Sequence, residues 1–241
     1  IFTKTSEVIQ SIQVTNMHPI SGDVSLPSVE EVKYRAYGLI SSQNRAVTRE
    51  DYLSLIYNMP SKFGAIKRAS VVQDVNSFKR NLNIYTISEN QNGNLSLPTT
   101  TLKNNLKTWL SRNKMINDTI DILDAKIVNV GIQFEIMADD YVNKYDILNQ
   151  AISALASEVS ISKYNIGEPI RVSNFYRTLK NIDGLLDVIS IKIVKKVGTD
   201  YSSVDFDIKE NTSLDGRLVG IPMDHIFEFK FPNLDIVGKV K

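Results

Sequence analysis

An alternation of apolar residues between positions 128 and 136 constrains the fold more than any other feature of the sequence. The apolar residues are Val128, Val130, Ile132, Phe134 and Ile136. Successive side chains of a strand point to opposite faces, so these five would share one face, while Asn, Gly, Gln and Glu occupy the other. That apolar face has to be buried, and the sequence therefore predicts a sheet that is covered on one side.

The stretch RAVTREDYLSLIYNMP, residues 45–60, has the pattern of a helix start, although its charges and tyrosine also suggest a reactive cluster. The Thr48 hydroxyl can accept from a free backbone amide, and the Asp51 carboxylate can reach back to the cap, as in a capping box. The residues at helical spacing on the apolar side are Tyr52, Leu55, Ile56 and Met59. Pro60 ends the run. Arg45 and Arg49 are then surface charges or anchors.

Further elements are predicted from the same kinds of signal. A helix over 29–40 begins with the capping-box pair Ser28 and Glu31 and ends near Gly38. Strands are predicted at 65–74, 82–88 and 187–197, and helices at 99–113 and 143–160. The apolar stripe of the helix at 143–160 consists of Leu148, Ile152, Leu155 and Val159. A last helix over 172–184 is capped by Ser173 and closed by Gly184.

These elements predict an α+β protein with two small helix-on-sheet sandwich modules, an N-terminal arm and a C-terminal tail with a short strand. The expected divisions are an arm and helix at 1–44, modules at 45–117 and 118–197, and a tail at 198–241. In order, the first module reads helix, strand, strand, helix and the second strand, helix, helix, strand. The modules are related by a circular shift of the chain, or they resemble each other only as any two small sandwiches do.

Composition restricts the function. A net charge of +1 is unusual for a chain whose main role is to bind nucleic acid, since neutralising phosphates needs a basic surplus. The absence of cysteine excludes disulfides and zinc held by thiolates. No apolar run approaches the roughly 20 residues that span a bilayer, so we expect a soluble chain. It begins with Ile1, which suggests a piece of a longer polypeptide.

We find no residue set that predicts catalysis, a cofactor or a metal ion. His18 lies in a Pro-rich loop and His225 beside a terminal strand, and neither has a second ligand at helical spacing. Asp139 and Asp140 follow a strand and precede a helix, where a turn and a helix N-terminus favour carboxylates. No nucleophile elbow, phosphate-binding loop or dinucleotide fingerprint occurs.

The charges are unevenly distributed. Residues 62–114 contain nine Lys or Arg against two acidic residues, whereas residues 118–158 contain eight acidic residues against two Lys. Two alternatives are open: the two stretches form ordinary solvated faces, or they pack against each other between modules or between copies of the chain. The candidate interface residues are Lys103, Lys107, Asp139, Asp140, Phe227, Phe229 and Phe231. The three phenylalanines, which alternate in the tail, dock either on a module of the same chain or on a neighbouring chain.

Several segments together resemble the baseplate J-like proteins of contractile-tailed bacteriophages, with the T-even-like wedge proteins as the nearest branch. The resemblance covers roughly residues 20–196 and includes LPSVEEVKYRA, VGIQFEIMADD and GEPIRVSNFYRTLKNIDGLLDVISIKIV. Its most specific part is Arg-Ala-Val-Thr-x-x-Asp-Tyr at 45–52, and the terminal PMDHIFEFKFPNLDIVGKV resembles the end of the T-even-like member. MPSKFG departs from the family's usual Pro-Gly turn after the first helix.

This resemblance implies a structural role without catalytic residues, cofactors or metal ions. Copies of the chain would pair and link into a ring around the tail hub, join other baseplate wedge proteins, and take part in the contraction trigger. The protein would be assembled in the host cytoplasm and end in the virion, with no membrane or nucleic-acid partner. The chain would be the C-terminal part of a longer wedge protein.

A nucleic-acid-binding module is the alternative. The basic stretch 62–114, with Phe78 and Trp109, has the mixture of basic and aromatic residues that suits single strands. Trp109 shares the apolar face of its helix with Leu102 and Leu106, however, which predicts a buried ring and disfavours this alternative.

Overall fold

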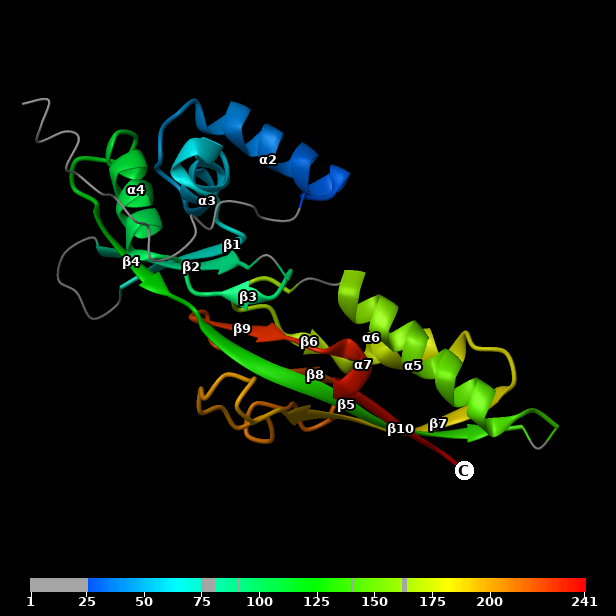
Figure 1. The fold of residues 1–241 in the computed structure, drawn as a ribbon. Helices are drawn as coiled ribbons and strands as arrows, with labels where there is room; N and C mark the ends of the chain where they lie inside the picture. Colours follow the sequence, from blue (N-terminus) through cyan, green and yellow to red (C-terminus); the bar gives the residue numbers. More distant parts are fainter. Residues whose placement is uncertain (1–25, 75–80, 91, 140, 162–163) are drawn as a thin grey trace, which may run out of the picture.

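The structure is a computed structural model that describes residues 26–74, 81–90, 92–139, 141–161 and 164–241. It has an α+β fold with two helix-on-sheet modules, which confirms the expected class (Figure 1). The elements of the first module are α2 (Val29–Ser42), α3 (Arg49–Tyr57), η1 (Ser61–Phe63), β1 (Arg68–Gln73), β2 (Asn81–Glu89), β3 (Leu95–Ser96), α4 (Thr100–Ser111) and β4 (Thr119–Asp124).

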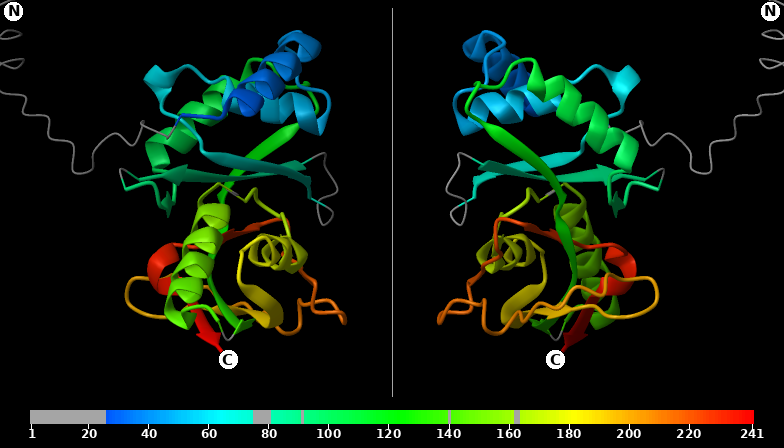
Figure 2. Two further views of the ribbon diagram at one scale, coloured as in Figure 1. Left: turned by 90° about the vertical axis from the view of Figure 1, so that its right-hand side faces the viewer. Right: turned by 90° about the vertical axis from the view of Figure 1, so that its left-hand side faces the viewer.

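The first sheet is organised around β2. Strand β1 pairs antiparallel with one edge of β2, and the other edge pairs with β4 in parallel and with β3. Helices α3 and α4 cover one face of this sheet, and the second module lies on the other side (Figure 2). The core between helices and sheet includes Tyr52, Leu55, Ile84, Leu106 and Leu110.

The second module contains more strands than the sequence predicted. Its elements are β5 (Lys126–Ala138), α5 (Lys144–Ile161), β6 (Ile170–Arg171), α6 (Val172–Lys180), β7 (Leu185–Lys195), β8 (Leu218–Val219), β9 (His225–Glu228), α7 (Pro232–Asp235) and β10 (Ile236–Val240). Strand β7 pairs antiparallel with one edge of β5. On the other edge, β9 and then β10 pair with β5 in parallel.

Two stretches therefore lie elsewhere than expected. Residues 119–124 complete the first sheet, although the sequence placed them in the second module. Residues 225–228 and 236–240, expected in a separate tail, are strands of the second sheet. Pairing with a long central strand satisfies their backbone groups and buries Phe227 and Ile236 in the core of the second module.

The modules meet at a small apolar cluster. Strands β4 and β5 are separated by Ala125 alone, so the chain passes from one sheet to the next almost without a linker. Ala125 packs with Ile87 of β2, Ile166 and Ile226 of β9. Because Ile84 faces the helices and Ile87 faces this cluster, β2 is covered on both faces.

The helix predictions hold with two corrections. Helix α2 continues through Gly38 to Ser42; a side chain at Gly38 would overlap the Ser54 hydroxyl, so this glycine permits close approach of α3. Ser173 lies inside α6, whose cap Arg171 makes no side-chain cap bond. Gly184, with φ of +83°, does form the turn before β7.

The buried stripe of α5 and the covered faces of β5 also differ from expectation. The fully buried residues of α5 are Ile147, Ala151, Leu155 and Val159, whereas Leu148 and Ile152 are half-buried. In β5 the expected apolar face is buried, but Asn129 and Gly131 on the other face are buried too. The polar face is covered because residues from the C-terminal segment, including Ser202 and Asp235, lie on it.

Candidate functional site

The stretch 45–60 forms a helix start. The Thr48 hydroxyl accepts a hydrogen bond from the Asp51 amide at 3.2 Å, and Asp51 Oδ2 accepts one from the Thr48 amide at 2.9 Å, which confirms the capping box. Burial alone would raise the pKa of Asp51. The hydrogen bonds from the Thr48 and Val47 amides and the Thr48 hydroxyl outweigh it and hold the pKa below its usual value.

Tyr52 makes a contact that the sequence did not predict. Its hydroxyl donates to Oδ2 of Asp118 at 2.7 Å, and both side chains are buried. Asp118 directly precedes β4, so this bond ties α3 to the edge of the first sheet. No local pattern relates two residues that are 66 positions apart.

The candidate charges of the first module are paired within the chain. Lys103 Nζ of α4 lies 2.9 Å from Asp124 of β4, and Lys107 Nζ lies 3.9 Å from Asp121. The basic and acidic stretches thus meet partly inside one module. Whether Lys103 and Lys107 also contact a partner stays a prediction.

The basic stretch 62–114 is not one exposed surface in the described part of the chain. Lys67 and Arg68 are buried, and Trp109 donates from Nε1 to the Leu55 carbonyl at 2.9 Å. Phe78 lies outside the described residues. Burial and internal pairing of these groups weaken the nucleic-acid alternative.

The three alternating phenylalanines pack on their own chain. Phe227 is 2% exposed and stacks edge-on against Phe206 with ring centroids 5.8 Å apart. Phe229 packs against Phe175, and Phe231 lies edge-on to Tyr201. Of the two alternatives for these rings, docking within the chain describes the structure. Strand β9 ends at Glu228, because the segment turns there toward α7.

Asp139 lies at the end of β5, where its Oδ1 accepts from the Tyr141 amide at 3.3 Å in a turn. Asp140 and His18 lie outside the described residues. His225 is buried and its Nδ1 lies 2.7 Å from Asp224, which also pairs with Lys126 at 3.2 Å. These contacts hold the first residues of β9 beside the first residues of β5.

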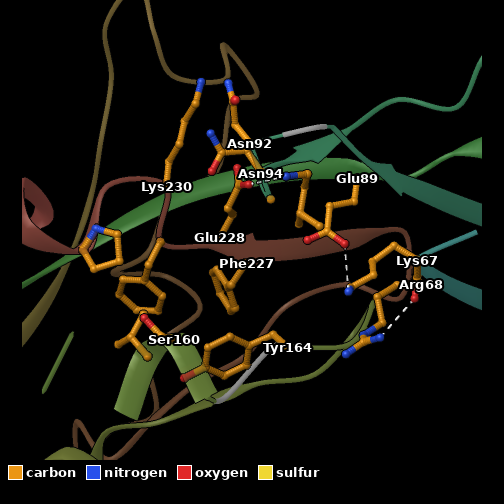
Figure 3. A pocket seen from close by; sticks show the side chains of 15 residues that line it. Lys67, Arg68, Glu89, Asn92, Asn94, Ser160, Tyr164, Phe227, Glu228 and Lys230 are labelled. Carbon is orange, nitrogen blue, oxygen red and sulfur yellow. Dashed lines mark hydrogen bonds and ion pairs between the residues drawn. The ribbon is translucent and has the colours of Figure 1, made fainter. Parts of the chain in front are cut away.

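A cavity of about 320 Å³ lies where the modules meet (Figure 3). Its lining includes Lys67, Arg68 and Glu89 from the first module and Tyr164, Glu228 and Phe229 from the second. Two of these cations are already paired: Lys67 Nζ lies 2.8 Å from Glu89, and Arg68 Nη2 lies 2.9 Å from Glu31 of α2. Burial raises the pKa of the Tyr164 hydroxyl, which therefore stays neutral near pH 7.

Glu228 links the two modules across this cavity. Its Oε1 accepts from the Leu95 amide of β3 at 2.6 Å, and its Oε2 accepts from Asn129 Nδ2 of β5 at 2.8 Å. Burial raises the pKa of this carboxyl, and the two hydrogen bonds only partly oppose that rise. The side chain therefore connects the first sheet to the second.

Asp235 is a second buried carboxylate that the sequence did not single out. It is 0% exposed and accepts from the Tyr201 hydroxyl at 2.7 Å and from the Phe231 amide at 2.9 Å. Lys196 Nζ lies 3.5 Å away. The hydrogen bond to Asp235 raises the pKa of Tyr201 to about 12. These bonds fix α7 beside β5 and so position β10.

The described residues contain neither a metal-binding cluster nor a membrane-spanning helix. No group of three or more His, Asp or Glu side chains there is placed to hold a metal ion. None of the helices in the same part of the chain is long and apolar enough to cross a membrane.

Comparisons with known proteins give structural likeness at a low level only. No family model matches the chain, and neither does any curated protein. Among solved structures, a chain of the anti-feeding prophage (AFP) baseplate, determined by cryo-EM with six-fold symmetry, is similar with a TM-score of 0.47 and 14% identity. The match covers 70% of this chain and 38% of that chain. At this level of similarity the comparison does not identify the protein.

Proposed function

We propose that this chain is a non-enzymatic structural protein of the baseplate wedge of a contractile-tailed bacteriophage. In this proposal copies of the chain pair and contribute to an inner ring around the tail hub, which links the wedges and takes part in the contraction trigger. The protein is assembled in the host cytoplasm and resides in the virion. The most specific segment of the sequence resemblance, 45–52, supports a structural role because its polar side chains cap α3 and tie it to Asp118.

The observation that carries the proposal is an apolar face on α2 that no other described element covers. Helix α2 packs on α3, where Gly38 lies against Ser54 and the Arg35 guanidinium lies over the Tyr57 ring, and α2 turns its other side outward. The exposed apolar residues on that side are Val29, Val32, Ala36, Tyr37 and Ile40. Tyr37 and Ile40 are 75% and 77% exposed. Contiguous apolar surface of this kind marks protein–protein contact sites.

The spacing of these residues suits a second copy of the same helix. Positions 29, 32, 36 and 40 follow one another at intervals of three and four residues, as in the seam of two packed helices. A helix of 14 residues is about 21 Å long, so an antiparallel pair of α2 helices can bury the full stripe of each copy. Such a contact is isologous and closes as a dimer.

Sedimentation velocity over a concentration series tests the pairing. We expect the wild-type chain to reach a dimer mass and the variant Val32→Ser with Ile40→Ser to stay monomeric. The matched control is Val197→Ser with Leu214→Ser, which removes two exposed apolar side chains away from α2 and should leave the dimer intact. A monomeric wild-type chain, or a dimer that survives the α2 substitutions, contradicts the proposal.

The baseplate assignment has its own test. The chain is mixed with candidate wedge proteins and the mass of any complex is measured by light scattering. We expect a complex with at least one of them. If none forms with any candidate, the assignment to a wedge fails.

A further inference from the structure

The end of β5, the start of α5 and the start of β7 lie at the end of the second module that is farthest from the first (Figure 1). These three segments carry exposed aromatic and aliphatic side chains. We call this group the distal patch, and its members are Met137, Tyr141, Val142, Tyr145 and Leu186. Tyr141 and Tyr145 are 96% and 78% exposed. Tyrosine is enriched where proteins bind one another, since its ring supplies contact area at low entropic cost.

Backbone contacts hold the three segments together. Ala138 pairs with Leu185, and the Asp139 amide donates to the Gly184 carbonyl at 3.1 Å. The register of β7 shifts beside Leu186, and this bulge directs its side chain outward to 62% exposure. Val142 packs tightly against Gly184, with Cγ2 3.3 Å from where a Cβ would stand. The patch is therefore part of the folded end of the sheet.

Unpaired carboxylates surround these side chains. Asp139, Asp146, Asp183 and Asp187 lie in or next to these segments. The basic residues beside them are Lys144 and Lys241, and Lys241 Nζ lies 3.4 Å from Glu135. None of the four carboxylates forms an ion pair with a described residue. The acidic residues of β4 differ, because Lys103 and Lys107 neutralise them within the chain.

We propose that the distal patch binds a cationic surface of another protein, on which Lys or Arg side chains stand beside apolar ones. A cation over the Tyr141 or Tyr145 ring gains a cation–π contact, and the surrounding carboxylates favour the approach of positive charge. The inference rests on the proposed assembly function and names the chemistry of one further partner. It concerns a different surface from α2.

The charges of this chain argue against a second copy as the occupant. Its most basic stretch has Lys67 and Arg68 buried in ion pairs, and Lys103 and Lys107 are paired with β4. These four cations are thus already engaged within the described part of the chain. A partner that brings its own cations fits better.

Calorimetric titration of the full chain with a model partner tests the inference. The probe is an amphipathic helical peptide of leucine and lysine, and its counterpart has glutamate in place of every lysine. We expect the lysine peptide to bind and the glutamate peptide not to bind. The double variant Tyr141→Ser with Tyr145→Ser should lose about tenfold in affinity, the factor expected for two exposed cation–ring contacts. The variant Asp146→Asn with Asp187→Asn should bind more weakly and with less dependence on salt.

The matched control is Glu210→Gln with Asp215→Asn, which removes two exposed charges away from the patch and should bind as the wild type does. Circular dichroism confirms that each variant is folded. Unchanged affinity in the tyrosine variant, equal binding of the glutamate peptide, or an equal loss in the control would each overturn the inference. Sedimentation distinguishes the other occupant: a dimer that dissociates in the tyrosine variant would show that a second copy occupies the patch. If the lysine peptide does not bind the distal patch, the α2 dimer is still expected in sedimentation. Failure of this inference can therefore be distinguished from failure of the proposed function.

Discussion

Replacing Tyr52 by phenylalanine removes a single hydroxyl from the core of the first module. The hydroxyl donates to the buried carboxylate of Asp118 at 2.7 Å, and a hydrogen bond to a charged group contributes about 1.5–3 kcal/mol. The ring itself stays, so no large cavity forms. We therefore expect Tyr52→Phe to lower the free energy of unfolding by about 2 kcal/mol. For a chain of this size the melting temperature should fall by roughly 5 °C.

Trp109 provides a local assay for this loss. It is the single tryptophan, and its indole donates to the carbonyl of Leu55, which lies on α3 together with Tyr52. Urea unfolding followed by tryptophan fluorescence thus reports the first module. The control is Tyr34→Phe, since Tyr34 is 69% exposed and its loss should change stability by less than about 0.5 kcal/mol. If Tyr52→Phe unfolds at the same urea concentration as this control, the buried bond does not stabilise α3 as we argue.

Three further predictions concern protonation and packing. Burial raises the pKa of Glu228, so the ionised carboxylate opposes folding. In urea titrations the wild type should therefore gain stability relative to Glu228→Gln as the pH falls from about 7 to about 5. A constant difference between the two proteins would contradict this. The pKa of Asp51 is lowered from 3.8, so the ionised carboxylate stabilises the fold above that pH, and this stabilisation disappears below it. The wild type should therefore lose stability relative to Asp51→Asn as the pH falls from about 6 to about 3. In Gly238→Ala the added methyl group would overlap the Phe134 ring, which should lower the free energy of unfolding by about 1–3 kcal/mol in thermal melts. Gly220→Ala meets only an ordinary contact and should cost little; equal costs for both would refute the packing argument.

Local signals explain which parts of the fold were predictable. The capping boxes at Ser28 and Thr48 use groups three residues apart, and both helices begin where those pairs place them. The strand at 128–136 was equally clear, because alternation over nine residues depends only on the chain itself. Gly184 also forms the expected turn.

Pairing between distant segments explains the rest. Strand β10 contains a glycine and has only five residues, so its place beside β5 depends on the buried bonds of Asp235. The acidic residues of β4 suggested a charged surface, yet the strand pairs in parallel with β2. For Phe227, a candidate interface residue, the sequence left two alternatives, docking on a module of its own chain or on a neighbouring chain. Phe227 is buried because the C-terminal segment belongs to the second sheet. The distal tyrosines were missed, since no sequence pattern shows that Tyr141, Tyr145 and Leu186 meet.

The two modules share less than their sequences suggested. In each, the central strand leads to a helix: β2 leads through the short strand β3 to α4, and β5 leads to α5. The antiparallel neighbour is preceded by a helix, α3 before β1 and α6 before β7, as a circular shift requires. The parallel strands break the correspondence: β4 follows α4 directly, whereas β10 arrives only at the end of the chain.

The side chains follow the same division. Leu55 and Leu179 are both buried, which supports the match between α3 and α6. Tyr52 is buried, but Tyr176 is half-buried and Phe175 occupies the core beside it. Tyr52 thus serves the first module alone, because β4 enters the first sheet just after Asp118, whereas β6, the strand that follows α5, pairs with β8 and not with β5. Removing its hydroxyl should therefore weaken one module and leave the packing of the other unchanged.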